Sequence, residues 1–340
     1  GLGDVYKRQI HDLSLGGANL IFLTLKLLEF KYQKARQSIA NFLLIEEPEA
    51  HIHTHIQKTL FDNLNYDDTQ IIYSTHSTHI SEVSNVQNMN ILGKIGDRCD
   101  AYQPTTGLRA EEINNIQRYL DAVRSNLLFA KSVILVEGDA EEILIPILVK
   151  TVLGISLDEL GISLINIRST GFQNVAILFH DKRICKRCSI VTDYDKSIID
   201  TTPQPNDDNA LCRRKNKYKN SQERGDIRKK KLESLCNNNR WISPFFAQYT
   251  FEIDFVMAGN ADKVIGLIPD IYNDDKIKTK AESDLKSADV AQYGKRILTM
   301  AEKKGKGWFA ILLGKKVDPQ TTIPQYILLS LIHISEPTRH

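Results

Sequence analysis

Three short apolar runs in this chain each end abruptly in acidic residues. They span residues 41–47 (NFLLIEE), 133–139 (VILVEGD) and 190–195 (IVTDYD). An apolar run of this length is typical of a buried parallel strand. Because ligands of open α/β sheets bind at the carboxyl ends of the strands, acids in these positions are expected to face a crevice. The pattern predicts an α/β protein with two metal-dependent sites, one for a nucleotide and one for a phosphodiester.

The first part of the chain alternates between helical and strand patterns. The predicted elements are a helix from 14 to about 37, a strand over 42–45, a helix over about 52–64 and a strand over 70–76. Ser14, Gly16 and Gly17 lie at the start of the first helix, where backbone N–H groups can approach a phosphate and the helix dipole favours its charge. An ordinary helix-start turn explains these residues equally well.

The strand ends of this part carry candidate nucleotide chemistry. Glu46 and Glu47 follow the first strand, an arrangement that can hold Mg²⁺ through water and polarise a water that attacks ATP. His76 closes the next strand, where an imidazole can sense a γ-phosphate. Taken singly, adjacent acids at a strand end are also consistent with solvated loop charges. A lone histidine is more often packed or solvated than functional.

A change of pattern follows. Residues 97–107 are polar and contain Pro104 and Gly107, which predicts a linker or surface loop. Apolar residues then recur at helical spacing over 111–130, and we expect this helix to bridge two domains.

The second unit is predicted to begin at Ser132. A strand over 133–136 delivers Glu137, and Asp139 caps a helix. A strand over 163–167 follows, with a helix that ends near Lys182.

A third strand, over 189–192, delivers Asp193 and Asp195. Residues at i and i+2 of an extended segment share one face, so both aspartates can aim at one cation. Carboxylate oxygens suit Mg²⁺ or Mn²⁺. The alternative is that these strand-end acids merely cap helices.

Composition sets modest bounds on this picture. A chain of 340 residues favours about two domains, and 44 Lys and Arg against 42 Asp and Glu neither demand nor exclude a nucleic-acid partner. The longest apolar stretch, residues 20–28, is interrupted by Lys26 and is far shorter than the roughly 18 residues of a membrane span. No signal peptide opens the chain, so we expect a cytoplasmic protein with no membrane contact.

Local charge and cysteine positions add two further observations. Residues 213–231 contain ten Lys and Arg against two acids, a density that can bind phosphates by releasing counterions. A solvated, flexible insertion fits the same tract. The five cysteines are scattered, which argues against a disulfide framework. Cys185 and Cys188 have zinc-like spacing, but a second pair is missing from the sequence.

Both ends of the chain look foreign to the fold. Residues 1–9 and 329–340 resemble translated sequencing-adapter tails, so we expect the natural protein to be longer at both ends. The sequence contains no G-x-x-x-x-G-K-[ST] phosphate loop. The nucleotide half is therefore expected to be incomplete.

In order and spacing, residues 14–76 resemble the distal half of an ABC-type ATPase. The likeness rests on a signature-like segment at 14–19, a Walker B strand that ends in two glutamates, the run EPEAH, and a switch histidine. It implies that Glu47 is the general base for ATP hydrolysis. The residues implied to bind ATP are Ser14, Gly16, Gly17, Glu46, Glu47 and His76. Leu15 and Ala18 depart from the usual signature Leu-Ser-Gly-Gly-Gln. In that family the signature serves the ATP of a partner subunit, which implies a dimer.

Glu137 together with Asp193 and Asp195 resembles a Toprim domain, the metal-binding fold of topoisomerases, primases and certain nucleases. An ABC-type half followed by a Toprim unit is similar to the OLD (overcoming lysogenization defect) ATP-dependent nucleases, which include the nuclease subunit of the Gabija antiphage system. The likeness covers about residues 10–328.

The OLD resemblance also implies further site residues. We count Glu141 among the metal ligands. Beyond Asp195 the family carries another acidic site and a late lysine, matched here by Glu252, with Asp254 as its neighbour, and by Lys306. Lys303 and Lys304 compete with Lys306 for the role of stabilising charge on the scissile phosphate.

The resemblance thus implies a fragment of an ATP-regulated DNA endonuclease that uses Mg²⁺ or Mn²⁺, with ATP bound in the full-length protein. Its α/β fold is expected to comprise a partial ABC-type ATPase domain (10–96), a linker and bridging helix (97–131), and a Rossmann-like Toprim domain with a parallel sheet (132–328) and a basic insertion near 200–240. DNA is the expected substrate, in phage defence or DNA processing. A homodimer or higher homo-oligomer through the ATPase half and a helicase-like partner are the expected assemblies.

Two other functions compete with this one. The first is a non-catalytic DNA-repair or clamp-type ATPase whose Toprim unit only binds nucleic acid or a partner. Topoisomerase or primase activity is the second, but it needs a nucleophilic tyrosine domain or a zinc module, and the sequence shows neither.

Overall fold

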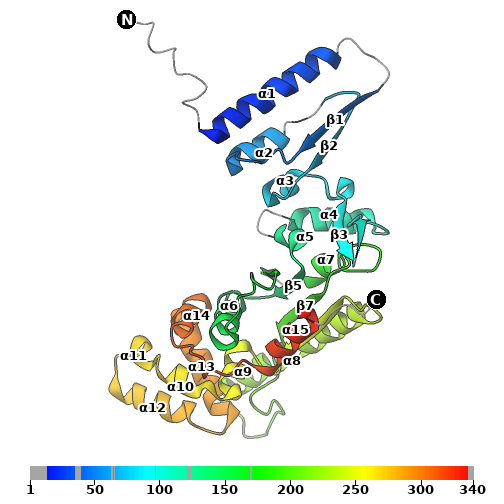
Figure 1. The fold of residues 1–340 in the computed structure, drawn as a ribbon. Coiled ribbons are helices and arrows are strands. Elements are labelled where there is room, and N and C mark those ends of the chain that lie inside the picture. The colour runs from blue at the N-terminus through cyan, green and yellow to red at the C-terminus, as the bar shows by residue number, and fades with distance from the viewer. Residues whose placement is uncertain are drawn as a thin grey trace, which may run out of the picture. The chain divides into compact units, whose positions relative to one another are not determined.

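The computed structural model describes residues 14–34, 40–62, 64, 66–95, 97–120, 124–168 and 171–335. The chain divides into two compact units, Gly1–Phe129 and Ala130–His340 (Figure 1). Across the described residues, every helix falls short of the length or the apolar character that a bilayer-spanning segment requires.

The first unit is built on a small parallel sheet. Its elements are α1 (Leu15–Lys34), β1 (Asn41–Glu46), α2 (Thr54–Asp62), β2 (Thr69–Ser74), α3 (Thr78–Val83), η2 (Val86–Asn88), β3 (Ile91–Ile95), β4 (Arg98–Tyr102), α4 (Ala110–Tyr119) and α5 (Asn126–Phe129). β1 pairs with β2 in parallel, and side-chain burial alternates along both strands. Leu44 is 73% exposed. The predicted strands exist, but the prediction that the first one is buried on both faces is wrong within the described chain.

Two predictions for the last part of the first unit also need correction. Residues 98–102 form β4, which pairs antiparallel with β3, where the sequence predicted a loop. The strand was missed because its residues are almost all exposed, so it carries no alternation of apolar and polar residues. The helix predicted over 111–130 is divided into α4 and α5, because Leu120 leaves the helical conformation at the end of α4.

The second unit carries a four-stranded parallel sheet in the order β6-β5-β7-β8. Its elements are β5 (Ser132–Val136), α6 (Asp139–Leu153), β6 (Ile162–Asn166), α7 (Phe172–Ala176), β7 (Cys188–Asp193), α8 (Asn209–Cys236), β8 (Ile242–Ala247), α9 (Phe251–Phe255), η3 (Val256–Asn260), α10 (Ala261–Ile265), α11 (Ile268–Ile271), α12 (Asp275–Leu285), α13 (Val290–Lys304), α14 (Lys306–Gly314) and α15 (Gln325–Ser335). Every residue of β5 is buried. The predicted strands over 133–136, 163–167 and 189–192 are confirmed as β5, β6 and β7.

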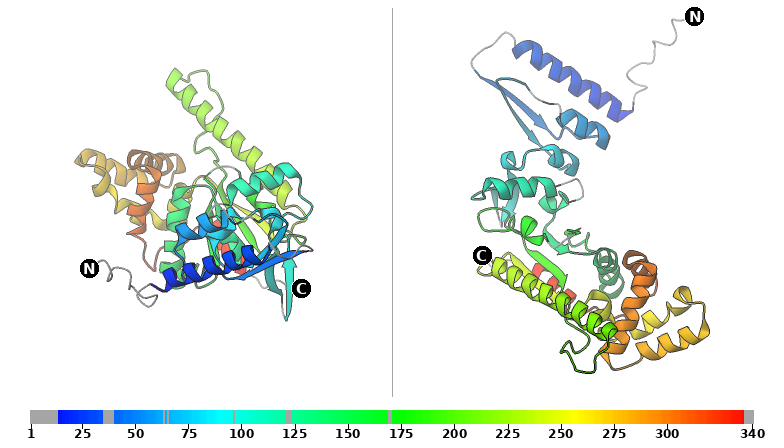
Figure 2. Two further views of the ribbon diagram at one scale, coloured as in Figure 1. Left: turned by 90° about the horizontal axis from the view of Figure 1, so that it is seen from above. Right: turned by 180° about the vertical axis from the view of Figure 1, so that it is seen from behind.

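Helices cover this sheet and extend beyond it. α15 packs against β5, β7 and β8, while α14 packs along α6. Figures 1 and 2 show α10–α14 in yellow and orange as one group beside α6. Because all four strands run parallel, their carboxyl ends lie at one edge of the sheet. This edge collects the residues that follow β5, β7 and β8.

The basic tract forms most of α8, a helix of 28 residues that begins at the N-cap Asp208. The alternative prediction for residues 213–231 was a solvated, flexible insertion, whereas the structure shows these residues in a helix. Gly225 lies where α8 crosses the chain after β7, because a Cβ at this position would overlap the carbonyl oxygen of Tyr194. The glycine therefore allows the helix to dock closely against the segment that carries Asp195.

Residues 329–335 form the C-terminal part of α15. Leu331 and Ile334 are buried, and the hydroxyl of Ser189 donates to the carbonyl of Ser330 at 2.8 Å. The assignment of 329–340 and 1–9 to adapter tails stays a prediction. Residues 1–9 and 336–340 lie outside the described part of the chain.

Candidate active site

In the first unit, the ends of β1 and β2 bring two predicted residues together. Glu46 is the last residue of β1 and pairs with Ser74 of β2. Glu47 follows with a φ of 41°, and its backbone N–H donates to the carbonyl of Ser74 at 3.2 Å. The Nε2 atom of His76 lies 3.7 Å from Oε1 of Glu47, and both side chains are largely exposed, at 84% and 57%. The pair lies at the surface of its unit.

The second acid of the EPEAH run, Glu49, stabilises the conformation of this edge. Its Oε1 atom accepts hydrogen bonds from the hydroxyl of Thr75 and the backbone N–H of His76, both at 2.7 Å. Gly16 has a structural role as well, because an added Cβ would overlap the carbonyl oxygen of His51. Sequence reasoning missed Glu49, although its place between Glu47 and a strand-end histidine was visible.

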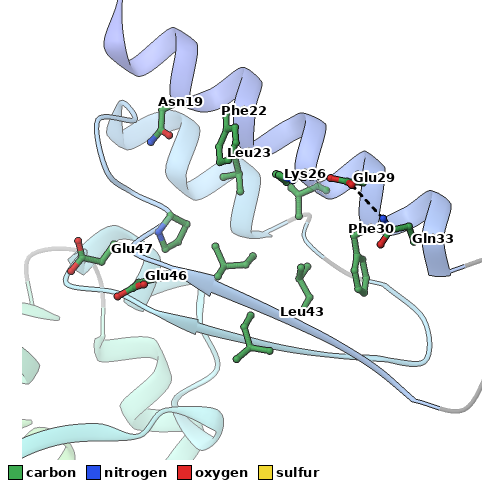
Figure 3. A pocket seen from close by; sticks show the side chains of 14 residues that line it. Asn19, Phe22, Leu23, Lys26, Glu29, Phe30, Gln33, Leu43, Glu46 and Glu47 are labelled. Carbon is green, nitrogen blue, oxygen red and sulfur yellow. Dashed lines mark hydrogen bonds and ion pairs between the residues drawn. The ribbon is translucent and has the colours of Figure 1, made fainter. Parts of the chain in front are cut away.

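A hollow of about 530 Å³ lies between α1 and β1 (Figure 3). Phe22, Leu23, Phe30 and Leu43 line it, and Glu46 and Glu47 lie at one end. The predicted ATP contacts of the signature-like segment and the switch histidine do not line this hollow. Apolar and polar side chains both line this hollow, and the strand-end glutamates belong to the lining.

In the second unit, the predicted acids of β5 and β7 meet at the carboxyl edge of the sheet. Glu137 directly follows β5, and its Oε2 atom accepts a hydrogen bond from the hydroxyl of Thr192 at 2.8 Å. Asp193 ends β7, and its Oδ1 atom is buried without a hydrogen-bond partner among the described residues. Asp195 follows with a φ of 61°, a left-handed conformation that turns the chain at this point.

An arginine from α8 reaches into this group of acids. The guanidinium of Arg228 lies 3.5 Å from Oε2 of Glu137 and 2.8 Å from Oδ2 of Asp195, and it also donates to the backbone carbonyl of Asp193. Its side chain is only 12% exposed. The sequence singled out the charge of the whole tract but not this residue, since no local pattern reveals which lysine or arginine turns inward.

A second set of residues faces the same place from three helices. Glu141 of α6 and Glu252 of α9 are both buried. The Nζ atom of Lys306, the first residue of α14, lies 3.6 Å from Oε1 of Glu252, and the Oε2 atom of Glu252 is buried without a partner in the described chain. Of the competing lysines, Lys303 instead lies over the ring of Tyr272, 4.4 Å from its centre.

Asp254, the neighbour named with Glu252, has a different role. Its carboxylate accepts the backbone N–H groups of Gln248 at 2.6 Å and Tyr249 at 2.9 Å. Both oxygens are thereby used to shape the loop between β8 and α9.

Electrostatic effects show that these acids share one environment. Burial raises the pKa of Glu141 to about 7, and the nearby carboxylates of Glu252 and Glu137 add to this shift. Burial, together with the carboxylates of Glu141, Glu252 and Asp195, raises the pKa of Asp193 well above its usual range. Burial lowers the pKa of Lys306, but the surrounding carboxylates outweigh this effect and the net shift is upward. The site thus holds more negative charge than its own cations neutralise.

Sequence reasoning also missed Tyr326 of α15. Its hydroxyl is buried without a partner among the described residues. Burial raises the pKa of Tyr326 well above its usual range, and Asp193 is the next contributor. The helix α15, which packs against β5, β7 and β8, thus places the Tyr326 hydroxyl within the electrostatic influence of Asp193.

The donor chemistry of the site fits a hard divalent cation. The unpartnered oxygens of Asp193 and Glu252 are the ligand type that Mg²⁺ and Mn²⁺ prefer. Among the described residues, however, no three His, Cys, Asp or Glu side chains are gathered closely enough to form a metal site. Arg228 instead provides the positive charge between Glu137 and Asp195.

Comparison with known families agrees with this geometry. Residues 128–195, which run from α5 through β5 and β7 to the second aspartate, match the family model described as the overcoming lysogenization defect protein-like Toprim domain. The chain carries an OLD-like Toprim domain. Residues 7–81 match the model of an AAA ATPase domain, so an ATPase region precedes the Toprim domain in this chain. The predicted resemblance and the predicted order of folds are confirmed.

Two solved structures are similar to this chain. The C-terminal region of the Burkholderia pseudomallei OLD protein is 25% identical, with a TM-score of 0.44, and the match covers 61% of this chain and 97% of that one. The C-terminal region of the Xanthomonas campestris pv. campestris OLD protein is 25% identical, with a TM-score of 0.42, and the match covers 62% and 94%. No curated protein is similar enough in sequence to count as a match.

Proposed function

We propose that the chain is part of an ATP-regulated, divalent-metal-dependent DNA endonuclease that cuts phosphodiesters at its Toprim site. The observation that carries this proposal is the convergence of Glu137, Asp193, Glu141, Glu252 and Lys306 on one environment at the carboxyl edge of a parallel sheet. Two of these acids keep a buried oxygen without a partner in the described chain. Unsatisfied buried carboxylate oxygens are costly, so a ligand of positive charge is expected there.

The proposed chemistry assigns one task to each residue. A bound Mg²⁺ or Mn²⁺ would polarise the phosphoryl oxygens and stabilise their charge. Asp193, Asp195, Glu141 and Glu252 are the candidate ligands. Glu137 is a further ligand or the base that takes a proton from the attacking water. The ammonium of Lys306 stabilises charge that develops on the scissile phosphate.

The ATPase region supplies the proposed regulation. Glu47 and His76 lie together at adjacent strand ends, which supports a role for both near the γ-phosphate of ATP in the full-length protein. ATP binding would then gate the nuclease through a homodimer or higher homo-oligomer of the ATPase half. A cytoplasmic role in phage defence or DNA processing, with a helicase-like partner, belongs to this proposal.

Nicking of supercoiled plasmid tests the central claim. With Mg²⁺ or Mn²⁺ we expect nicking by the full-length protein, which is used because loss of a dimer could silence an intact site. Asp193→Ala should lower the rate at least about 100-fold, as loss of a group that stabilises the transition state does. Asp270→Ala changes an exposed aspartate of α11 and is the matched control. Nicking that persists in a folded Asp193→Ala variant refutes the proposal.

One observation favours the non-catalytic alternative. Arg228 already neutralises Glu137 and Asp195, as expected of a Toprim unit that only binds nucleic acid or a partner. Metal-dependent nicking by the wild-type protein excludes this alternative. DNA binding that is insensitive to Mn²⁺, without nicking, supports it.

A further inference from the structure

A basic cleft adjoins the candidate site in the second unit. It lies between α8 and α13 and has a volume of about 780 Å³. Seven basic residues line it against two acidic ones, and the basic residues include Arg213, Lys217 and Arg224 of α8 and Lys295 of α13. The positive charge of α8 is therefore concentrated on a concave surface.

The α8 side of the cleft has a regular geometry. Arg213, Lys217 and Arg224 are spaced four and seven residues apart, so they share one face of the helix. None of the three forms an ion pair with a described residue, which leaves their charges available to a ligand. The row spans about 16 Å at 1.5 Å per residue. One strand of a DNA duplex presents roughly five phosphates over that length.

The cleft ends at the candidate site. Asp195 and Lys306 line the cleft and also belong to the group of acids and cations described above. Gly225 docks α8 against the chain beside Asp195, so the basic row has a fixed position relative to the strand ends. A polymer that follows the row is thereby led to Lys306.

We propose that the cleft between α8 and α13 binds one strand of duplex DNA through its phosphates and leads that strand to Lys306. Phosphate contacts of this kind are independent of sequence. The lining favours a duplex over a single strand because its one aromatic residue is Tyr218, and the guanidinium of Arg214 already lies 5.9 Å from that ring centre. Proteins that bind single strands typically offer several free aromatic platforms. The part of this proposal in which the cleft delivers the strand for cleavage rests on the proposed nuclease function. The part in which the cleft binds duplex DNA does not.

Fluorescence anisotropy with a short labelled duplex in EDTA tests the binding step without metal or cleavage. The cleft variant Arg213→Ala/Lys217→Ala/Arg224→Ala is compared with Lys219→Ala/Lys230→Ala/Lys231→Ala, which removes three exposed charges of the same helix outside the cleft. Each lost phosphate contact lowers the slope of log K against log salt concentration by about 0.9. We therefore expect the cleft variant to lose at least about tenfold in affinity and up to about 3 in salt slope. The control should lose less than about threefold, as nonspecific charge effects do.

The outcomes separate the cleft from the proposed function. Equal losses in both variants, or no loss in either, overturn the proposed cleft. Tighter binding of a single-stranded oligonucleotide than of the duplex, with the same sensitivity to the cleft variant, overturns the choice of duplex DNA. Binding lost in the cleft variant but unaffected by Asp193→Ala supports the cleft, even where nicking is absent and the nuclease function fails.

Discussion

The two units place acids at strand ends in the same way but surround them differently. In the first unit, β1 and β2 form a pair with one exposed face, and Glu47 and His76 are largely solvated. In the second unit, β5 is buried along its whole length, and the Oδ1 atom of the half-buried Asp193 is buried at the end of β7. The same sequence pattern therefore gives a solvated pair in one case and a largely buried cluster of charged side chains in the other. The difference depends on whether other elements cover the sheet, because covered strand ends hold their acids away from water.

Burial has a chemical consequence. Water screens the exposed pair of the first unit, so its charges interact weakly. The acids of the second unit shift each other's pKa because they share a poorly solvated space. We therefore expect substitutions of single residues to have larger effects in the second environment than in the first.

The largest expected effect is on the proposed catalysis in the second unit. Lys306→Ala should lower the rate of plasmid nicking by about 100-fold or more, as loss of one group that stabilises transition-state charge does. Lys303→Ala changes a lysine three residues earlier in the chain, which lies over the ring of Tyr272, and is the control. The rate should stay within about threefold, since an exposed cation–π contact contributes little. A reversed result would assign the catalytic role to Lys303.

A leucine pair compares the two sheets directly. Leu135→Ala, in the centre of β5, should lower the free energy of unfolding by about 2–5 kcal/mol. Leu44→Ala, on the exposed face of β1, should change it by no more than about 0.5 kcal/mol. Urea unfolding followed by far-UV circular dichroism measures both. A large loss in Leu44→Ala would show that another surface covers β1 in solution.

The shifted pKa of Glu141 predicts a pH-dependent stability. A folded-state pKa of about 7 lies above the ordinary value of 4.5, so the folded protein binds more protons than the unfolded chain between these limits. The free energy of unfolding therefore falls as the pH rises through this window.

Glu141→Gln removes this titration. In EDTA, its stability relative to wild type should rise from near zero at the acid end of the window to on the order of 3 kcal/mol above its upper end. Glu223→Gln, at an exposed position of α8, is the control. A constant difference at all pH values would contradict the assignment.

Arg228→Gln probes the competition between an internal cation and a metal ion. Because the guanidinium contacts Glu137 and Asp195, its removal should strengthen Mn²⁺ binding by about tenfold, a small part of the Coulomb energy available at such distances. Lys230→Gln removes the same charge from an exposed position of α8. Titration calorimetry measures both affinities. Weaker binding in Arg228→Gln would instead show that the arginine positions the acids.

The smallest expected effect is in the first unit. Because the sequence lacks a phosphate loop, which supplies most contacts to a triphosphate, we expect no measurable ATP hydrolysis by this chain. Glu47→Gln should then leave phosphate release at background. Turnover that disappears in Glu47→Gln would show that the exposed pair is already a working site.

The sequence predicted those features that depend on local pattern. β5, β6 and β7 are apolar runs, so their positions and the acids that follow them could be found by inspection. The contact of Arg228 with Glu137 joins residues far apart in the chain, and no local pattern encodes it.

Two other features escaped prediction for related reasons. The strand β4 is exposed, so it lacks the alternation that marks a half-buried strand. The position of the Tyr326 hydroxyl near Asp193 depends on the packing of α15 against β5, β7 and β8. Structure was needed wherever a residue acts through tertiary contacts.

The close approach at Gly225 constrains how α8 can change length. Downstream of this residue, Arg228 keeps its direction as long as the glycine stays at the crossing. Upstream, deleting one residue would rotate Arg213 and Lys217 by about 100° around the helix axis, away from the cleft. Deleting seven would return them almost to the same face. We therefore expect α8 to tolerate insertions and deletions of about seven residues, or two helical turns, upstream of Gly225. Such changes keep Arg213 and Lys217 on the same face of the helix relative to Gly225.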